Sequence, residues 1–202
     1  MIAFIKESPN SWVFHHDLPS GAEESLDNAI DCFEAGNIDE AEEILRKVLL
    51  VCPYYIDAFH HLALVFSESG LELESYLCSR EAARLGLEAI PSPFSWSTSR
   101  MLWGHLENRP FMRAYHSLGL SILDNQGAAS AIEIFARLVS VNPNDNLGCR
   151  YSLMQSYLDL KEWQAALNLS QQYNSDTGPD IVYSKVIALF QLAQDEEAIA
   201  AL

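Results

Sequence analysis

The sequence predicts an all-α fold in which antiparallel helix pairs stack into an array. Hydrophobic residues make up 49% of the chain, which is enough for a packed interior. Long stretches are rich in Ala, Leu, Glu and Ile, residues that favour helices, and strand signals are few. A similar phrase also occurs twice, as EAEEILRKVLLVCP ending at Pro53 and as SAIEIFARLVSVNP ending at Pro143. Counting back from these prolines indicates a repeat of about 34 residues.

The repeat frame divides the chain into four parts. Residues 1–21 are expected to form an N-terminal extension, and residues 22–89 a first block of two repeats. Residues 90–111 interrupt the frame as an aromatic-rich insertion. Residues 112–202 are expected to form a second block of two repeats and a partial third, which begins near Pro179.

The spacing of small and large residues has a physical cause. Small residues such as Ala29, Ala41, Gly119 and Ala131 recur where the two helices of a repeat are expected to cross, because a larger side chain would force the helices apart. Larger residues fill the space between one pair and the next. Because one pair cannot bury its own apolar face, stacked neighbours must bury it jointly.

This pattern resembles the tetratricopeptide repeat (TPR) family over most of residues 22–202. Residues 112–145 carry the resemblance best, through Tyr115, Leu118, Gly119, Ile122, Ala131, Phe135, Leu138 and Pro143. The resemblance implies a right-handed superhelical array, a TPR-like α-solenoid, whose first helices line a concave groove. It also implies that the groove binds a protein or peptide.

The family's groove positions translate into a set of candidate ligand-binding residues. They are Asp27, Ile30, Asp57, His60, Leu64, Glu68, Arg113, His116, Leu120, Tyr151 and Gln155. Acidic and apolar residues mix in the first half of this groove, so a basic or amphipathic segment is the natural complement.

A second resemblance is to a subset of bacterial TPR proteins, carried by LENRPFMRAYHSLGL and NPNDNLGCR. It implies that Arg109, Asn144, Asp145, Asn146 and Arg150 form a polar cluster around the third repeat. The alternative is that these residues cap helices and shape loops, as Asn and Asp commonly do.

The insertion is rich in large side chains, including Phe94, Trp96, Met101 and Trp103. We expect them to cover the side of the array as a satellite core. The alternative is a lip of the binding groove, because aromatic residues are strong interface anchors.

Charge and motif content exclude several classes of function. The formal net charge of −16 disfavours nucleic acid and anionic membranes as partners. The sequence has no apolar run of about 20 residues and no signal peptide, and its four cysteines are widely spaced, so a cytoplasmic protein is predicted. Neither a metal-ligand motif nor a catalytic signature occurs, so we expect no metal, no cofactor and no enzymatic activity.

These observations predict a scaffold or adaptor that binds a protein segment in its groove. Two alternatives are an acidic TPR-type chaperone for a secreted protein and an accessory interaction domain of a larger protein. The apolar residues Ile199, Ala201 and Leu202 are expected to lie near an uncapped C-terminal end, which makes a homodimer through that end a further prediction.

Overall fold

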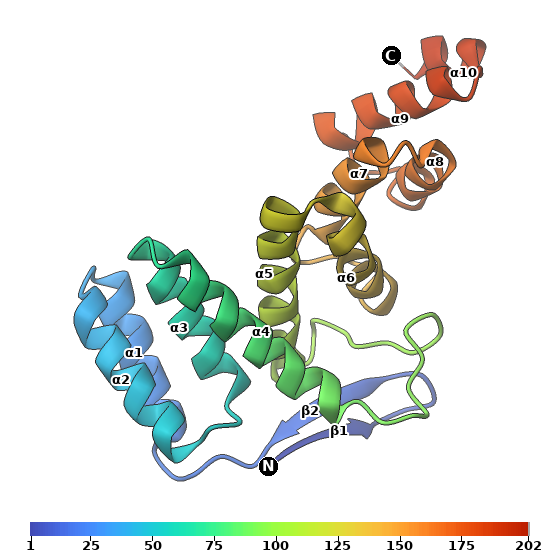
Figure 1. Ribbon diagram of the computed structural model, residues 1–202. Helices are drawn as coiled ribbons and strands as arrows, with labels where there is room; N and C mark the ends of the chain where they lie inside the picture. Colours follow the sequence, from blue (N-terminus) through green and yellow to red (C-terminus); the bar gives the residue numbers. More distant parts are fainter. Residues whose placement is uncertain (202) are drawn as a thin grey trace. The chain divides into compact units, whose positions relative to one another are not determined.

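The described residues form a series of helix pairs. The structure, a computed structural model, describes residues 1–201, and Leu202 lies outside the described residues. The helices of the first block are α1 (Ala22–Glu34), α2 (Ile38–Val51), α3 (Ile56–Glu68) and α4 (Glu72–Ala89) (Figure 1). Those of the second block are α5 (Arg109–Gln126), α6 (Ala128–Val141), α7 (Cys149–Asp159), α8 (Trp163–Gln172), α9 (Pro179–Gln191) and α10 (Asp195–Ala200). The predicted fold class is confirmed.

The predicted crossing points of the helices are tightly packed. Ala29 and Ala41 are buried where α1 and α2 meet. In the second pair, Ser75 of α4 takes the place of the expected Ala, and its hydroxyl donates a hydrogen bond of 2.8 Å to the carbonyl oxygen of Ala63 on α3. A Cβ atom on Gly119 would lie 2.9 Å from the Phe135 ring, so only glycine fits there without a shift.

A β-hairpin, which the sequence patterns do not predict, forms most of residues 1–21. Strand β1 (Ile2–Lys6) pairs antiparallel with β2 (Trp12–His16), and Phe4 lies opposite Phe14. The insertion covers the outer edge of β2, where the N–H of Trp12 donates to the carbonyl of Arg100 at 2.9 Å. The extension and the insertion are therefore joined in space although Trp12 and Arg100 are 88 positions apart in sequence.

Aromatic side chains from the hairpin and the insertion form the expected satellite core. Phe4, Trp12 and Phe14 of the hairpin are buried together with Phe94 of the insertion and Phe111 of α5. The Phe4 ring lies 5.2 Å from Phe94 and 4.4 Å from Phe14, and Phe14 lies 5.1 Å from Phe111. Such ring pairs contribute beyond their buried area.

Asn108, at the end of the short 3₁₀ helix η1 (Leu106–Asn108), ties this core together. Its side chain is fully buried. Its Oδ1 accepts a hydrogen bond of 3.0 Å from the N–H of Phe14, and its Nδ2 donates to the carbonyls of Trp12 and Leu102, both at 3.1 Å. One amide thus satisfies backbone groups of the hairpin and the insertion.

The chain divides into two compact units. Unit 1 holds Met1–Leu118 and Ser140–Asn142, and unit 2 holds Gly119–Val139 with the described residues from Pro143 onward. Residues 140–142 belong to unit 1 through contacts with the insertion, such as the bond from the N–H of Met101 to the carbonyl of Val141 at 3.0 Å. Among residues 1–201, we find no helix with the length and apolarity required to cross a membrane.

Candidate functional site

In unit 1 the first helices α1 and α3 share a mixed acidic and apolar surface. Asp27 of α1 and Glu68 of α3 are exposed, while Ile30 and Leu64 are partly buried beside them. The two helices contact one another. Burial lowers the pKa of His61 of α3, a shift that Asp57 and, more weakly, Glu34 of α1 oppose. We call the surface made by Asp27, Ile30, Leu64 and Glu68 the first-helix face.

Asp57, in the first turn of α3, is paired with a cation of unit 1. This corrects the expectation that Asp57 is an open acid of the groove. Nη2 of Arg113 on α5 lies 2.7 Å and 3.0 Å from the two oxygens of Asp57. Nε2 of His61 lies 3.7 Å from the same carboxylate. The Asp57 side chain is only 14% exposed, so its charge is largely neutralised within unit 1 rather than presented to a partner.

His60 is also placed differently from the expectation. It is 5% exposed and points into the interior of unit 1, so it does not line a surface. Burial, with smaller contributions from the neighbouring His61 and Arg113, lowers the pKa of His60 to about 3, although Asp57 opposes the shift. His60 is therefore a neutral core residue at physiological pH. His116 on α5 is half-buried and contributes to the same electrostatic environment.

His16 at the end of β2 also lies near Asp57, although the repeat pattern does not select it as a groove residue. Burial lowers the pKa of His16, while Asp57 opposes that shift. Nε2 of His16, Nδ1 of His60 and Nε of Arg113 are buried and have no hydrogen-bond partner in the described part of the chain. Nothing in the repeat frame could have placed His16 here, because the hairpin lies outside the repeats.

In unit 2, two of the five residues of the predicted polar cluster, Asp145 and Arg150, form an ion pair. Arg150 donates from Nη1 to Asp145 at 2.9 Å and from Nε to Asp176 at 2.7 Å. The Asp145 carboxylate also accepts the N–H groups of Cys149 and Arg150 at the start of α7. The capping alternative therefore describes Asp145.

The remaining three residues of the predicted cluster are placed differently from one another. Asn144 and Asn146 flank Asp145 in the loop before α7 and are exposed. Arg109 belongs to unit 1, where its guanidinium lies 5.0 Å from the centre of the Trp103 ring and its Nε donates to the Trp103 carbonyl at 3.0 Å. Arg109 thus holds the insertion rather than the loop before α7.

The other groove candidates of unit 2 lie at the surface and partly engage one another. Leu120 is exposed on α5. The Tyr151 hydroxyl donates to Asp176 at 3.0 Å and accepts from Arg150. Gln155 donates to Asp159 at 2.8 Å, one helical turn away. The hydrogen bond from the N–H of Gly178, together with Arg150, lowers the pKa of Asp176, which keeps this carboxylate charged.

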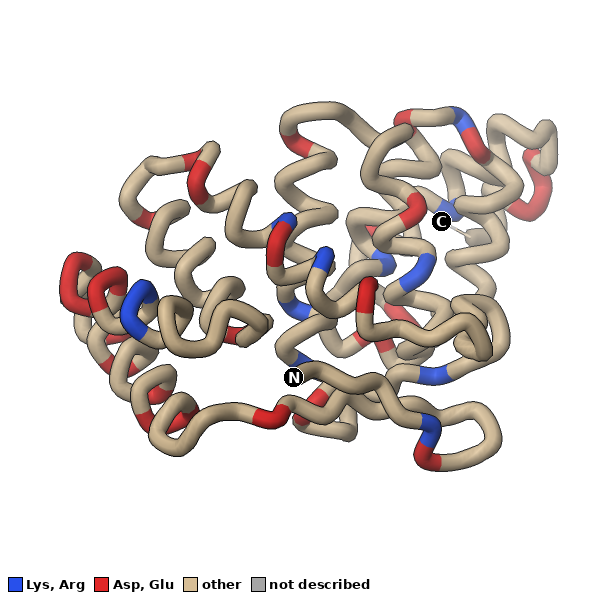
Figure 2. Tube along the Cα trace, turned by 60° about the horizontal axis from the view of Figure 1, so that its bottom comes forward, with Lys and Arg blue, Asp and Glu red and all other residues tan. Residues whose placement is uncertain are grey.

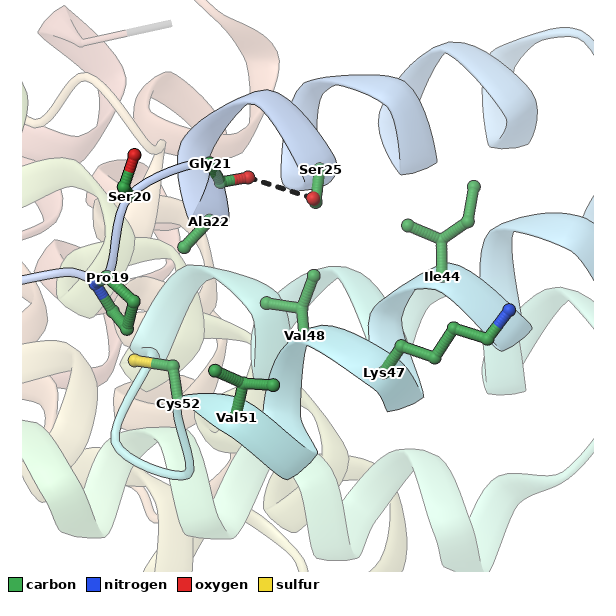
Figure 3. Close-up of a pocket in the computed structure, with 10 residues that line it drawn as sticks. All are labelled: Pro19, Ser20, Gly21, Ala22, Ser25, Ile44, Lys47, Val48, Val51 and Cys52. Atoms are coloured by element: carbon green, nitrogen blue, oxygen red, sulfur yellow. Dashed lines mark hydrogen bonds between the residues drawn. The ribbon is translucent and has the colours of Figure 1, made fainter.

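A hollow of about 330 Å³ lies between the start of α1 and the end of α2 (Figure 3). Its lining is mainly apolar and includes Ala22, Ile44, Val48 and Val51, with Lys47 at its rim. Ser25 donates to the carbonyl of Gly21 at 2.8 Å within the lining. Among residues 1–201, no group of three or more His, Cys, Asp or Glu side chains is arranged to hold a metal ion.

Helix pairs with small residues at their crossings define a TPR-like fold, and solved structures agree. MamA is similar at 16% identity, with a TM-score of 0.64, over 89% of this chain and 87% of that chain. YrrB, described as a TPR protein with an unusual peptide-binding site, is similar at 14% identity, with a TM-score of 0.65, over 88% and 80%. A chain of the Naa15/Naa10 complex bound to HypK-THB is similar at 12% identity, with a TM-score of 0.62, over 90% of this chain and 24% of that chain.

A match to a family model assigns the chain more narrowly than its fold does. Residues 31–202 match the model of the family described as transcriptional repressor TCF25, so the chain belongs to the TCF25 family. A comparison with curated protein sequences found no match. The predicted resemblance to TPR proteins is confirmed.

Proposed function

We propose that this chain is a non-enzymatic scaffold or adaptor that binds a basic or amphipathic protein segment on the first-helix face of unit 1. One observation carries the proposal: exposed Asp27 and Glu68 flank the partly buried Ile30 and Leu64 on two adjoining helices. An amphipathic segment can place apolar side chains between the helices and cations beside the acids. Asp57 is left out because Arg113 already neutralises it.

The comparisons support binding of a protein rather than of another kind of ligand. YrrB carries a peptide-binding site, and the Naa15/Naa10 complex binds HypK-THB. The TCF25 family is described by a role in transcriptional repression. We propose that any such role of this chain runs through a protein partner, because Asp and Glu far outnumber Lys and Arg over its helices, as Figure 2 shows. The four free cysteines suit a cytoplasmic location.

The test is differential affinity capture from native lysate with quantitative mass spectrometry. The wild-type chain is compared with a double variant, Asp27→Lys with Glu68→Lys, which reverses the charge of the first-helix face. We expect the variant to capture at least about tenfold less of one or more partners, since two reversed contacts each cost on the order of 1 kcal/mol or more.

A matched control carries the same change of net charge elsewhere. Asp39→Lys with Glu74→Lys reverses two exposed acids on the second helices α2 and α4. The control variant must still capture the partners of the wild-type chain. Circular dichroism must show that both variants are folded. Equal loss in both variants, or no loss in either, contradicts binding on the first-helix face.

A further inference from the structure

The last helix pair presents an apolar surface that the first-helix face does not include. Val186, Ile187 and Phe190 of α9 and Ala198 and Ile199 of α10 line a hollow of about 510 Å³. We call these residues, with Gln191 and Asp195, the α9–α10 face. Phe190 is 64% exposed, Ile187 44% and Ile199 73%, so the hollow opens to the surface of unit 2.

The spacing of these side chains fits a helix as the occupant. Tyr183, Ile187 and Phe190 recur at intervals of four and three residues, so they lie along one side of α9. Ile199 adds an apolar wall from α10. In this arrangement the apolar side chains of a docked helix, repeating at similar intervals, would pack between α9 and α10.

The charge around the hollow decides what kind of helix fits. Asp195 lines the hollow, and Glu196 and Glu197 follow it in the first turn of α10, all exposed. Lys185, the one cation of α9, does not line the hollow. An incoming helix with Lys or Arg beside its apolar stripe would pair with these acids, whereas an acidic helix would be repelled.

The same charges disfavour a second copy of this chain. A symmetric dimer through the α9–α10 face would bring Asp195, Glu196 and Glu197 of one copy toward those of the other. Each copy also carries a net charge of −16. The homodimer that the sequence suggests at this end is therefore the less favourable alternative.

We propose that the α9–α10 face is a second docking surface, which binds a basic amphipathic helix of a partner protein. This surface lies in unit 2 and does not depend on the first-helix face. Binding would bury Ile187, Phe190 and Ile199 and place cations of the partner beside Asp195, Glu196 and Glu197.

The test uses two designed helical peptides of about five turns. Both carry the same Leu and Phe stripe at helical spacing, one flanked by Lys and the other by Glu. We expect the full chain to bind the Lys peptide at least about tenfold more tightly than the Glu peptide in fluorescence polarisation. Phe190→Ser and the double variant Glu196→Lys with Glu197→Lys should each lower the affinity for the Lys peptide by about tenfold.

Two controls separate this surface from others. Leu106→Ser removes an equally exposed apolar side chain, 62% exposed on η1, and should leave affinity unchanged. Asp27→Lys with Glu68→Lys removes the acids of the first-helix face, and in that background Phe190→Ser should still weaken binding of the Lys peptide by about tenfold. A loss in that double variant with none in Phe190→Ser would overturn the proposal and favour the first-helix face.

Three other outcomes also overturn it. Equal affinity for the Lys and Glu peptides would show that Asp195, Glu196 and Glu197 do not select a basic helix. Absence of binding by both peptides would remove the docking surface. Sedimentation as a dimer that Phe190→Ser converts to a monomer would show that a second copy covers the face.

Discussion

Gly86 illustrates at the scale of a residue how the structure restricts a position that the repeat frame leaves open. It lies near the end of α4, where an added Cβ atom would overlap Cδ2 of Phe111. The Phe111 ring is itself fully buried against Phe14. Glycine therefore lets α4 approach the start of α5 at this point.

Gly86→Ala should destabilise the protein by about 1–3 kcal/mol, because the added methyl group must displace a buried ring. The loss should appear as a lower midpoint in urea denaturation. Gly104→Ala is the matched control, since a Cβ there meets nothing within 4 Å. A Gly86→Ala midpoint equal to that of Gly104→Ala would show that the Phe111 ring can move aside at little cost.

Charged and titratable residues show a similar dependence on surroundings. Asp57 and Arg113 both occupy predicted groove positions of the repeat, and each is the other's partner across α3 and α5. His60 occupies such a position too and is buried. The repeat position specifies which helix face a residue occupies, but it does not specify whether the hairpin and α5 cover that face.

At the scale of elements, the hairpin and the insertion depend on one another. A two-stranded hairpin alone is marginally stable in water. Here β2 gains hydrogen bonds from Arg100 and Asn108, and its aromatic side chains pack against Phe94 and Phe111. We infer that neither segment would keep this conformation without the other.

Asn108→Ala tests that dependence. It removes three hydrogen bonds and leaves the N–H of Phe14 and the carbonyl of Trp12 without their partner in a buried place, while the carbonyl of Leu102 keeps its hydrogen bond from the N–H of His105. We expect a loss of about 2–4 kcal/mol, since each buried unsatisfied group costs about 1–3 kcal/mol and water can reach some of them after local opening. Amide exchange at Phe14 should accelerate, as measured by hydrogen exchange with mass spectrometry.

Asn125→Ala is the control for this change. Asn125 is an exposed residue on α5 whose side chain donates a hydrogen bond to the carbonyl of Ser121. Its replacement should change stability by no more than about 0.5 kcal/mol. Unchanged exchange at Phe14 in the Asn108→Ala variant would mean that the aromatic packing alone holds the hairpin.

At the scale of the whole molecule, the buried histidines link stability to pH. His60 faces His61 and Asp57 on its own helix and Arg113 and His116 on α5. Burial lowers the pKa of His16, His60 and His61, with His60 at about 3. In the unfolded chain the pKa values of these groups return to about 6.5, so the unfolded state binds more protons below that pH.

Stability should therefore be full above about pH 6.5 and fall as the pH drops toward 5, before most carboxylates titrate. His60 alone should contribute a loss of about 2 kcal/mol over that interval. Urea midpoints at several pH values measure the slope. The slope should be shallower in His60→Leu and unchanged in His15→Ser, where an exposed histidine is replaced. A flat profile in the wild-type protein would contradict the burial of neutral histidines.

The repeats are predictable from sequence because their cause is local and periodic. The frame places α1 to α10 as pairs, and α9 begins at Pro179, where the partial repeat is expected. Small residues at the crossings, such as Ala41 and Gly119, are predictable because close approach of two helices excludes a larger side chain. Net charge likewise restricts the kinds of partner, because it depends on composition alone.

Only the tertiary structure decided which candidate residues are accessible. The hairpin pairs with an insertion that is remote in sequence, and no periodic pattern reveals such a pairing. Burial lowers the pKa of His16 of β2, a shift that Asp57 opposes, and α5 supplies Arg113 as the partner of that acid. Burial and ion pairing depend on which segments fold over a helix face, so His60 is buried and Asp57 is paired with Arg113, while Asp27 and Glu68 stay exposed.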